Sequence, residues 1–113
     1  MIEIRITLDQ EGNLFTLKAE GHSMSAKKGS NIACAAVSAQ LRSAVRALKT
    51  CSLAVTEVTA DKPGFLELAV TVRADGRLWL KGVTDVLLAG LLETERDFPD
   101  ECSIKLFEKE LRS

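Results

Sequence analysis

The segment IEIRITLDQEGNLFTLKAE occupies residues 2–20 and sets the architecture that we expect for this chain. Its first seven residues alternate between aliphatic and polar side chains, which is the pattern of a strand with one buried face. Residues 10–13 include the turn-forming residues Gly and Asn, and a second apolar-rich run follows at 14–20. The segment therefore predicts a β-hairpin.

The remaining residues predict two helices and three further strands. A helix is expected over 31–50, because one helical stripe is mostly apolar: Cys34, Val37, Leu41, Ala44, Val45 and Leu48. Strands are expected at 53–58, 65–72 and 102–107, and a second helix at 78–97 ends before Pro99. The order ββαββαβ predicts an α+β fold, a two-layer sandwich with two helices on one face of a mostly antiparallel sheet. We expect residues 1–113 to form a single domain.

The second predicted helix is more apolar than a helix with one covered face requires. Its expected core stripe comprises Val83, Val86, Leu87, Gly90 and Leu91. Leu88 and Leu92 then fall on the opposite side, where a polar surface would be normal. Two leucines on an outer face predict a partner surface, and a second copy of the chain is the simplest partner.

Composition excludes several classes of function. The formal net charge is −1, with 15 basic and 16 acidic residues, and the aromatic residues are one Trp and four Phe. Neither a phosphate-binding surface nor a base-stacking platform is expected, so we expect no nucleic-acid partner. No apolar run reaches the roughly 20 residues that span a bilayer, and charges interrupt the N-terminal segment, so we expect no membrane partner. Three cysteines, well separated in the sequence, indicate free thiols in a reducing cytoplasm.

The only histidine and one cysteine lie close together in the sequence, which makes them candidates for a base and a nucleophile. His22 follows the second strand, and Cys34 lies near the start of the first helix, where the dipole favours a thiolate. Ser30 or Asn31 is expected to cap this helix. Asn31 could also orient His22, and Ser38, one turn beyond Cys34, could form hydrogen bonds near the site. The purely structural alternative is that Cys34 packs in the core and His22 is an ordinary surface residue.

Other reactive residues give weaker patterns. Cys51 ends a helix and Cys102 begins a strand, and neither is near a base in the sequence. A zinc site of three cysteines and a histidine would lack paired C-x-x-C spacing, so we expect no metal and no cofactor. Lys27 and Lys28 precede a helix start that could hold an anion, but the glycine spacing excludes a Walker motif.

The residues around this pair resemble the Prp family of bacterial ribosomal-processing cysteine proteases. The family pattern is a Gly-His pair, a small glycine-containing loop, and then D-I-V-C-A-A-V-S. Here Gly21 precedes His22, Gly29 lies in the loop, and residues 31–38 read NIACAAVS. Asn31 stands where the family has Asp, and Ala33 where it has Val. The chain length, the order of elements and Phe98-Pro99-Asp100 also fit the family.

The resemblance implies a cysteine endopeptidase with His22 as the base and Cys34 as the nucleophile. The implied substrate and partner is the precursor of the twenty-seventh large-subunit ribosomal protein, from which family members remove an N-terminal extension after an aromatic-rich apolar segment. Family members are small homodimers. We expect a loop that closes over the substrate, formed by Ser23, Met24, Ser25, Ala26, Lys27, Lys28, Gly29 and Ser30.

Two alternatives remain open from the sequence. Asn31 lacks the negative charge that would stabilise an imidazolium, which favours a catalytically weak protein of the same fold that only binds a ribosomal protein. A thiol redox sensor could use Cys34 alone, although neither Cys51 nor Cys102 is near it in sequence as a resolving thiol.

Overall fold

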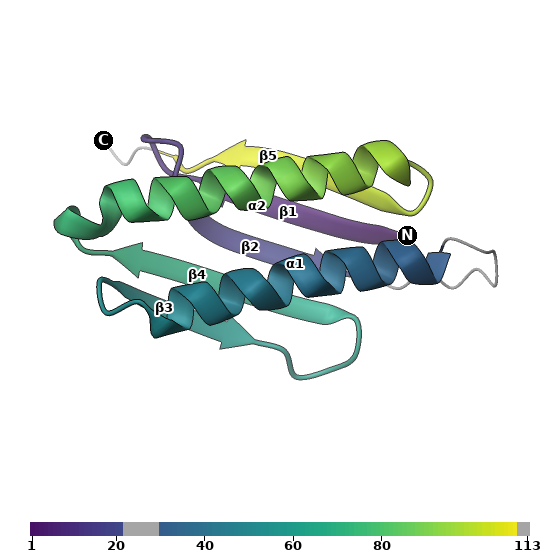
Figure 1. Cartoon of the computed structure of the whole chain (residues 1–113), viewed down its shortest axis with the longest axis horizontal. Coiled ribbons are helices and arrows are strands. Elements are labelled where there is room, and N and C mark those ends of the chain that lie inside the picture. Colours follow the sequence, from purple (N-terminus) through teal and green to yellow (C-terminus); the bar gives the residue numbers. More distant parts are fainter. Residues whose placement is uncertain (22–29, 111–113) are drawn as a thin grey trace.

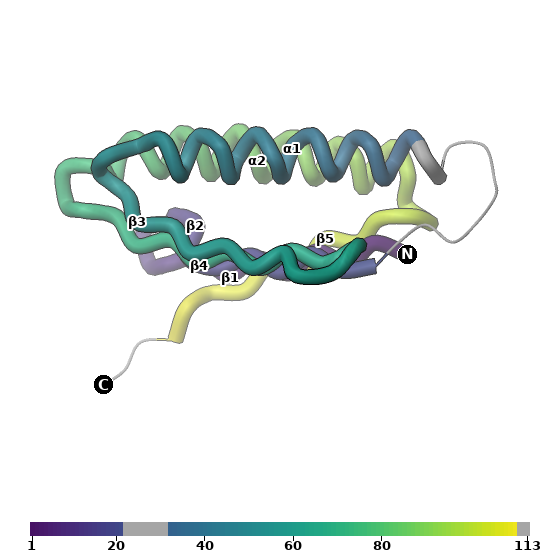
Figure 2. The backbone as a smooth tube through the Cα atoms, turned by 90° about the horizontal axis from the view of Figure 1, so that it is seen from below, coloured from purple at the N-terminus to yellow at the C-terminus, as the bar shows by residue number. Residues whose placement is uncertain are grey.

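The computed structural model describes residues 1–21 and 30–110 of the chain. Within these residues, five strands and two long helices follow the predicted order ββαββαβ (Figure 1). The elements are β1 (Ile2–Leu8), β2 (Leu14–Glu20), α1 (Ser30–Thr50), β3 (Ala54–Thr59), β4 (Phe65–Val72), the 3₁₀ turn η1 (Ala74–Gly76), α2 (Arg77–Asp97) and β5 (Cys102–Glu108). Both helices lie in one layer above the sheet (Figure 2), which confirms the two-layer α+β sandwich.

The sheet has the strand order β3-β4-β2-β1-β5. The pairs β1–β2, β2–β4 and β3–β4 are antiparallel, and β5 pairs with β1 in parallel. The predicted mostly antiparallel sheet is therefore confirmed. The parallel pair arises because α2 carries the chain back along the sheet before β5 begins, as a crossover connection must. The pairing of β2 with β4 brings the end of β2 beside the start of β4.

The hairpin turn is held by backbone hydrogen bonds between Asp9 and both Gly12 and Asn13, and by the Asp9 carboxylate. The Asp9 side chain accepts hydrogen bonds from the backbone N–H groups of Glu11, at 2.9 Å, and Asn13, at 3.0 Å. Short polar side chains stabilise turns in this way, because they offer the backbone an acceptor that the strand no longer supplies. This fixes the register in which the aliphatic residues of β1 and β2 share the helix-covered face.

The core lies between the sheet and the two helices. The alternation seen in β1 places Ile2, Ile4 and Ile6 in it, all at most 5% exposed. Leu17 and Leu68 are contributed by β2 and β4, and α1 contributes the stripe Ala33, Val37, Leu41, Ala44 and Leu48. Cys34 and Val45 are partly buried at the edge of this core. The predicted apolar stripe of the first helix is thus confirmed, with Cys34 at its margin.

Helix α2 is rotated about its axis relative to the prediction. Its buried residues are Leu80, Thr84, Leu87, Leu91 and Thr94. The prediction was wrong for Val86, which is 75% exposed, and for Leu88, which packs against the core. Leu92 is 41% exposed, so only this member of the predicted outer pair is exposed.

Two buried threonines explain the rotation of α2. The Thr84 hydroxyl accepts a hydrogen bond from the backbone N–H of Leu14, at 3.0 Å. The Thr94 hydroxyl accepts one from the side-chain amide of Gln40 on α1, at 2.8 Å. A buried N–H group without an acceptor is costly, so these polar contacts stabilise this orientation of the helix over another apolar one.

Candidate active site

Cys34 is the fifth residue of α1 and is half-buried. The helix begins at Ser30, one residue earlier than expected, so Ser30 and Asn31 are its first two residues. Whether Ser30 or Asn31 caps the helix stays a prediction. The side chains of Ser30 and Asn31 lie outside what the structure describes.

Gly21 directly follows β2 and has a backbone conformation that favours glycine, with φ at +110°. A Cβ atom at this position would collide with the backbone carbonyl oxygen of Met1. The Gly21 N–H donates a hydrogen bond to the carbonyl oxygen of Gly64, at 2.9 Å, and this bond ties the end of β2 to the turn before β4. Gly21 therefore sets the direction in which the chain leaves the sheet.

His22 and residues 23–29 of the predicted substrate loop lie outside the described residues. The roles assigned to His22, Ser23, Met24, Ser25, Ala26, Lys27, Lys28 and Gly29 therefore remain predictions. The described residues on both sides of this segment are nevertheless close in space, because Gly21 and Cys34 line the same pocket.

The pocket beside Cys34 has a volume of about 590 Å³. One wall is α1, and the opposite wall is the end of β2 and the start of β4. The residues around it are Ile2, Ala19, Glu20, Gly21, Cys34, Val37, Ser38, Leu41, Arg42, Gly64, Phe65 and Leu66. Among the predicted site residues, Gly21, Cys34 and Ser38 are thus brought together. The lining is mainly apolar, with charged groups from Glu20 and Arg42.

Sequence reasoning missed the contribution of β4 to this pocket. Phe65 and Leu66 follow a strong turn signal, which identified the strand but not its neighbour. Leu66 reaches the pocket because β4 pairs with β2, where it lies opposite the buried Ala19. The ring of Phe65 lies instead beside Lys18 and Lys62, on the other face of the sheet. Local periodicity contains no information on this pairing between segments that are distant in the sequence.

The three cysteines have different environments, and all are free thiols. Cys34 and Cys51 are both half-buried, at opposite ends of α1. Cys102 is buried; this burial, followed by the nearby Glu95 carboxylate, raises the pKa of its thiol. Among the described residues, no group of three His, Cys, Asp or Glu side chains is placed to hold a metal ion.

These environments predict the order in which the thiols are alkylated. With iodoacetamide near neutral pH, Cys34 should react at least about tenfold faster than Cys51, because Cys34 lines an open pocket near the N-terminal turn of α1, whereas Cys51 follows the other end of the helix. Cys102 should react only after unfolding, because a buried, protonated thiol is a poor nucleophile. Peptide mapping by mass spectrometry over time measures all three rates. Equal rates for Cys34 and Cys51 in the native protein would contradict this assignment.

The position of the Cys34 thiol on the wall of a mainly apolar pocket indicates which class of reaction this site can catalyse. A thiol near the start of a helix can attack a carbonyl carbon, and backbone N–H groups of the first helical turn can stabilise the oxyanion that forms. The pocket next to it offers apolar contacts to the acyl part of a substrate. Together, the fold and the site are those of a small thiol-dependent hydrolase.

The chain belongs to the cysteine protease Prp family, whose sequence model matches residues 1–103. It is therefore a cysteine protease, as the signature around Cys34 predicted. The match includes every described strand and helix except the last part of β5. No curated protein matches the sequence.

Solved structures share the fold. The ribosomal processing protease Prp of Staphylococcus aureus, in complex with a covalently linked product peptide, gives a TM-score of 0.79 at 20% identity over 94% of this chain and 99% of that one. The same protease with a substrate peptide gives 0.78, at the same identity and coverage. A protein of Streptococcus mutans gives 0.78 at 20% identity over 96% of both chains.

Proposed function

We propose that this chain is a cytoplasmic endopeptidase that removes a short N-terminal extension from the twenty-seventh large-subunit ribosomal protein. The observation that carries the proposal is the position of Cys34, near the start of α1 and on the wall of a mainly apolar pocket. The family match and the peptide complexes of the S. aureus protease support it. We propose that residues 1–113 act as one protease domain.

In the proposed mechanism, His22 and Cys34 act as a dyad. The imidazole takes the thiol proton as the sulfur bonds to the scissile carbonyl carbon. The C–N bond then breaks, and the imidazolium gives its proton to the leaving amine. Water attacks the resulting thioester and passes a proton to the imidazole, and the C–S bond breaks to release the carboxyl product and the thiol. Backbone N–H groups of the first turn of α1 stabilise the oxyanion in both steps.

The pocket supplies the binding energy that positions the scissile bond. Val37, Leu41 and Leu66 form its apolar part. Burial of one large apolar side chain contributes about 2–3 kcal/mol, enough to favour cleavage next to an apolar residue by about 30-fold or more. Because the pocket and Cys34 share the wall of α1, the bound side chain lies next to the nucleophile.

A cleavage assay tests this proposal. The purified protein is incubated with a synthetic peptide that spans the extension and the mature N-terminus of the host ribosomal protein, and the products are identified by mass spectrometry. We expect one cut, between extension and mature sequence. Binding without any cut would favour the peptide-binding alternative. Reversible oxidation of Cys34 by peroxide, without binding or cleavage, would favour the redox sensor.

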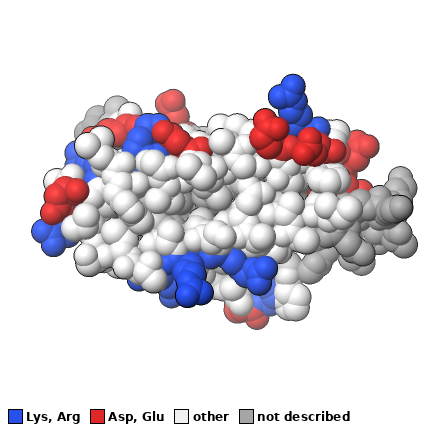
Figure 3. Space-filling view, viewed as in Figure 1, with Lys and Arg blue, Asp and Glu red and all other residues white. Residues whose placement is uncertain are grey.

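We further propose that two copies of the chain associate through the outer face of the helical layer. This face carries a mainly apolar groove of about 780 Å³ between α1 and α2. Figure 3 shows the outer face of the helical layer as a broad uncharged band, with charged side chains along its two long edges. Small residues on α1, Ala39, Ser43 and Ala47, line the groove, whereas Leu78 and Val86 on α2 are 89% and 75% exposed. A two-fold axis would place the protruding residues of each copy in the hollow of the other.

The double variant Leu78→Lys/Val86→Lys tests this interface. Each buried aliphatic side chain contributes about 2 kcal/mol, and symmetry doubles the number lost, so Kd should rise about a thousandfold or more. Light scattering should then give the mass of one chain, where the unmodified protein gives that of two. Val55→Lys is the matched control, because Val55 is 69% exposed on β3, away from the groove. An unchanged dimer mass in the double variant would rule out this face.

A further inference from the structure

Two glycines face each other at the end of the ladder between β2 and β4. The antiparallel register that pairs Glu20 with Phe65 continues for one more position, at which the Gly21 N–H donates to the Gly64 carbonyl oxygen at 2.9 Å. Both glycines have positive φ angles, +110° at Gly21 and +72° at Gly64, which residues with a Cβ atom rarely adopt. This pair of glycines therefore closes the described part of the ladder.

Gly21 is confined between two neighbouring strands. Because β2 lies between β4 and β1 in the sheet, Gly21 has Gly64 on one side and the start of β1 on the other. The Met1 carbonyl oxygen approaches Gly21 so closely that a Cβ atom there would collide with it. Met1 precedes Ile2, whose N–H donates to the Glu101 carbonyl oxygen at 2.8 Å. The contact with β1 limits movement of Gly21 in one direction, and the hydrogen bond to Gly64 limits it in the other.

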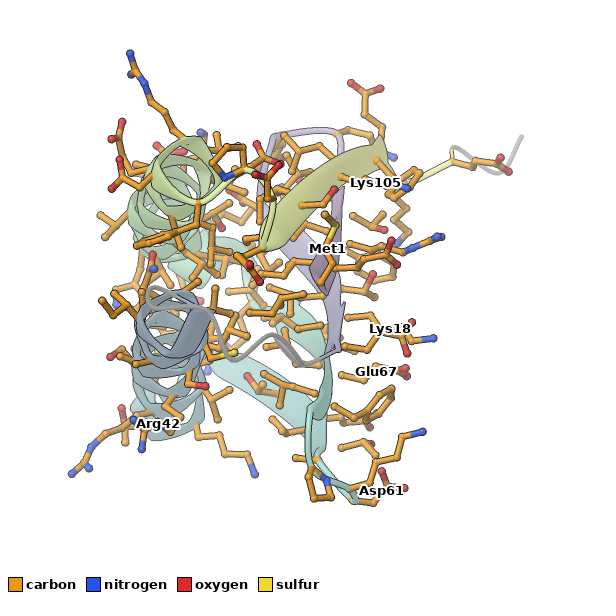
Figure 4. The ribbon with its side chains drawn as sticks, turned by 90° about the vertical axis from the view of Figure 1, so that its right-hand side faces the viewer. Met1, Lys18, Arg42, Asp61, Glu67 and Lys105 are labelled. Carbon is orange, nitrogen blue, oxygen red and sulfur yellow. The ribbon has the colours of Figure 1, made fainter. Side chains whose placement is uncertain are left out.

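The turn between β3 and β4 carries Gly64. Gly64 follows Asp61, Lys62 and Pro63, which together form a strong turn sequence. The Lys62 Nζ lies 5.1 Å from the centre of the Phe65 ring, and this cation–π contact holds the turn against the first residue of β4. Figure 4 looks onto this end of the molecule, with Asp61 in the turn and α1 in the layer across from the sheet. The turn and the start of α1 therefore lie at the same end of the fold (Figure 1).

Gly21 and Gly64 line the same pocket as Cys34. Cys34 belongs to α1, whereas the two glycines lie where β2 ends and β4 begins. His22 follows Gly21 directly in the sequence, so a displacement of the Gly21 backbone also displaces the attachment point of the imidazole relative to the thiol. A general base must lie within about 3 Å of the atom whose proton it takes, and an error of about 1 Å can cost about 10²-fold in rate. The rate should therefore depend on what holds Gly21.

We propose that Gly64 is a positioning residue for the reaction: its carbonyl oxygen holds Gly21, and through Gly21 it sets where the imidazole of His22 is presented to Cys34. The inference rests on the proposed function, because it takes His22 as the base. Gly64 supplies no group to the chemistry and acts only through the backbone of Gly21. It also lies outside residues 21–38, the segment that carries the family resemblance.

Gly64→Ala and Gly12→Ala form a matched pair of variants. Gly12 has nearly the same φ angle, +78°, in the turn that precedes β2, at the opposite end of that strand from Gly21. A Cβ atom at Gly12 meets only the end of the Lys81 side chain, at 3.7 Å. Both variants should lower Tm, because both place a Cβ atom at positive φ. Only Gly64→Ala should lower kcat for the precursor peptide, by about 10- to 100-fold. Gly64→Asn should keep most of this activity, because Asn tolerates positive φ.

A double variant separates the positioning of His22 from a general effect on the pocket. In His22→Ala assayed with added imidazole, the base no longer depends on the position of Gly21. Gly64→Ala should then change the rescued kcat by less than about twofold, because a residue that acts through His22 has nothing left to position. A further tenfold loss in the double variant would overturn the proposal, as would equal kcat for Gly64→Ala and Gly12→Ala.

The imidazole signal in NMR distinguishes a failure of this inference from a failure of the protease assignment. His22 is the only histidine in the chain, so the proton on its Cε1 atom gives one resonance that can be followed in every variant. Gly64→Ala should move this resonance toward its position in the unfolded protein, and Gly12→Ala should leave it unchanged. If the unmodified protein cleaves no peptide, this displacement still supports the role of Gly64. The same His22 resonance in Gly64→Ala and in the unmodified protein would overturn that role, whatever the activity.

Discussion

Replacement of Cys34 by alanine should lower kcat for cleavage of the precursor peptide by about 10⁴-fold or more, the size of loss that follows removal of a covalent nucleophile. Without the sulfur atom no thioester forms, and the apolar pocket can still hold the peptide. KM or Kd for the peptide should therefore change much less than kcat. The rates are measured by chromatography of the products under saturating substrate, with thermal unfolding as a check that the fold is kept.

Cys51→Ala is the matched control for this variant. Cys51 is also half-buried and is adjacent to the same helix, but at its other end. The control should keep kcat within about twofold, because a change at a half-buried position away from the pocket does not alter the reacting atoms. Cys34→Ser should be as inactive as the alanine variant, because a hydroxyl is a weak nucleophile without a stronger base. Activity of the Cys34 variants within tenfold of the unmodified protein would disprove the nucleophile.

Replacement of His22 by alanine should lower kcat by about 10²- to 10⁴-fold, because no other histidine is present in the chain to take the thiol proton. Added imidazole should restore part of the activity of this variant, since a small base can occupy the space that the side chain leaves. Cleavage rates are compared with and without imidazole at fixed pH. Imidazole should not rescue Cys34→Ala, which lacks the nucleophile. An unchanged kcat in His22→Ala would show that another group acts as the base.

Local patterns in the sequence were sufficient to predict most elements of this fold. The strands at 14–20 and 65–72 have the predicted bounds, and the two helices begin within one residue of the prediction. Alternation and helical spacing depend only on residues that are close in the sequence, so they predict strands and helices without knowledge of the tertiary contacts. Cys34 was placed correctly near a helix start for the same reason, and Gly21 proved to be a position that needs glycine.

The contacts between elements were less predictable. Helix α2 is apolar on several sides, so periodicity alone could not choose between Val86 and Leu88 as core residues. The choice follows from Thr84 and Thr94, whose hydroxyl groups bond to Leu14 and Gln40. Likewise, Leu66 reaches the pocket through the pairing of β4 with β2, which joins segments that are distant in the sequence.

The central claim is that Cys34 forms a covalent bond to the acyl part of a peptide, and an acyl-enzyme trapping experiment tests it most directly. The protein is mixed with the precursor peptide, quenched in acid within milliseconds to seconds, and analysed by intact mass and peptide mapping. The account predicts a thioester adduct that adds the mass of the N-terminal cleavage fragment less one water, located on Cys34 and absent from Cys34→Ala. Cleavage that proceeds without any adduct on Cys34, or an adduct on Cys51 or Cys102, would contradict it.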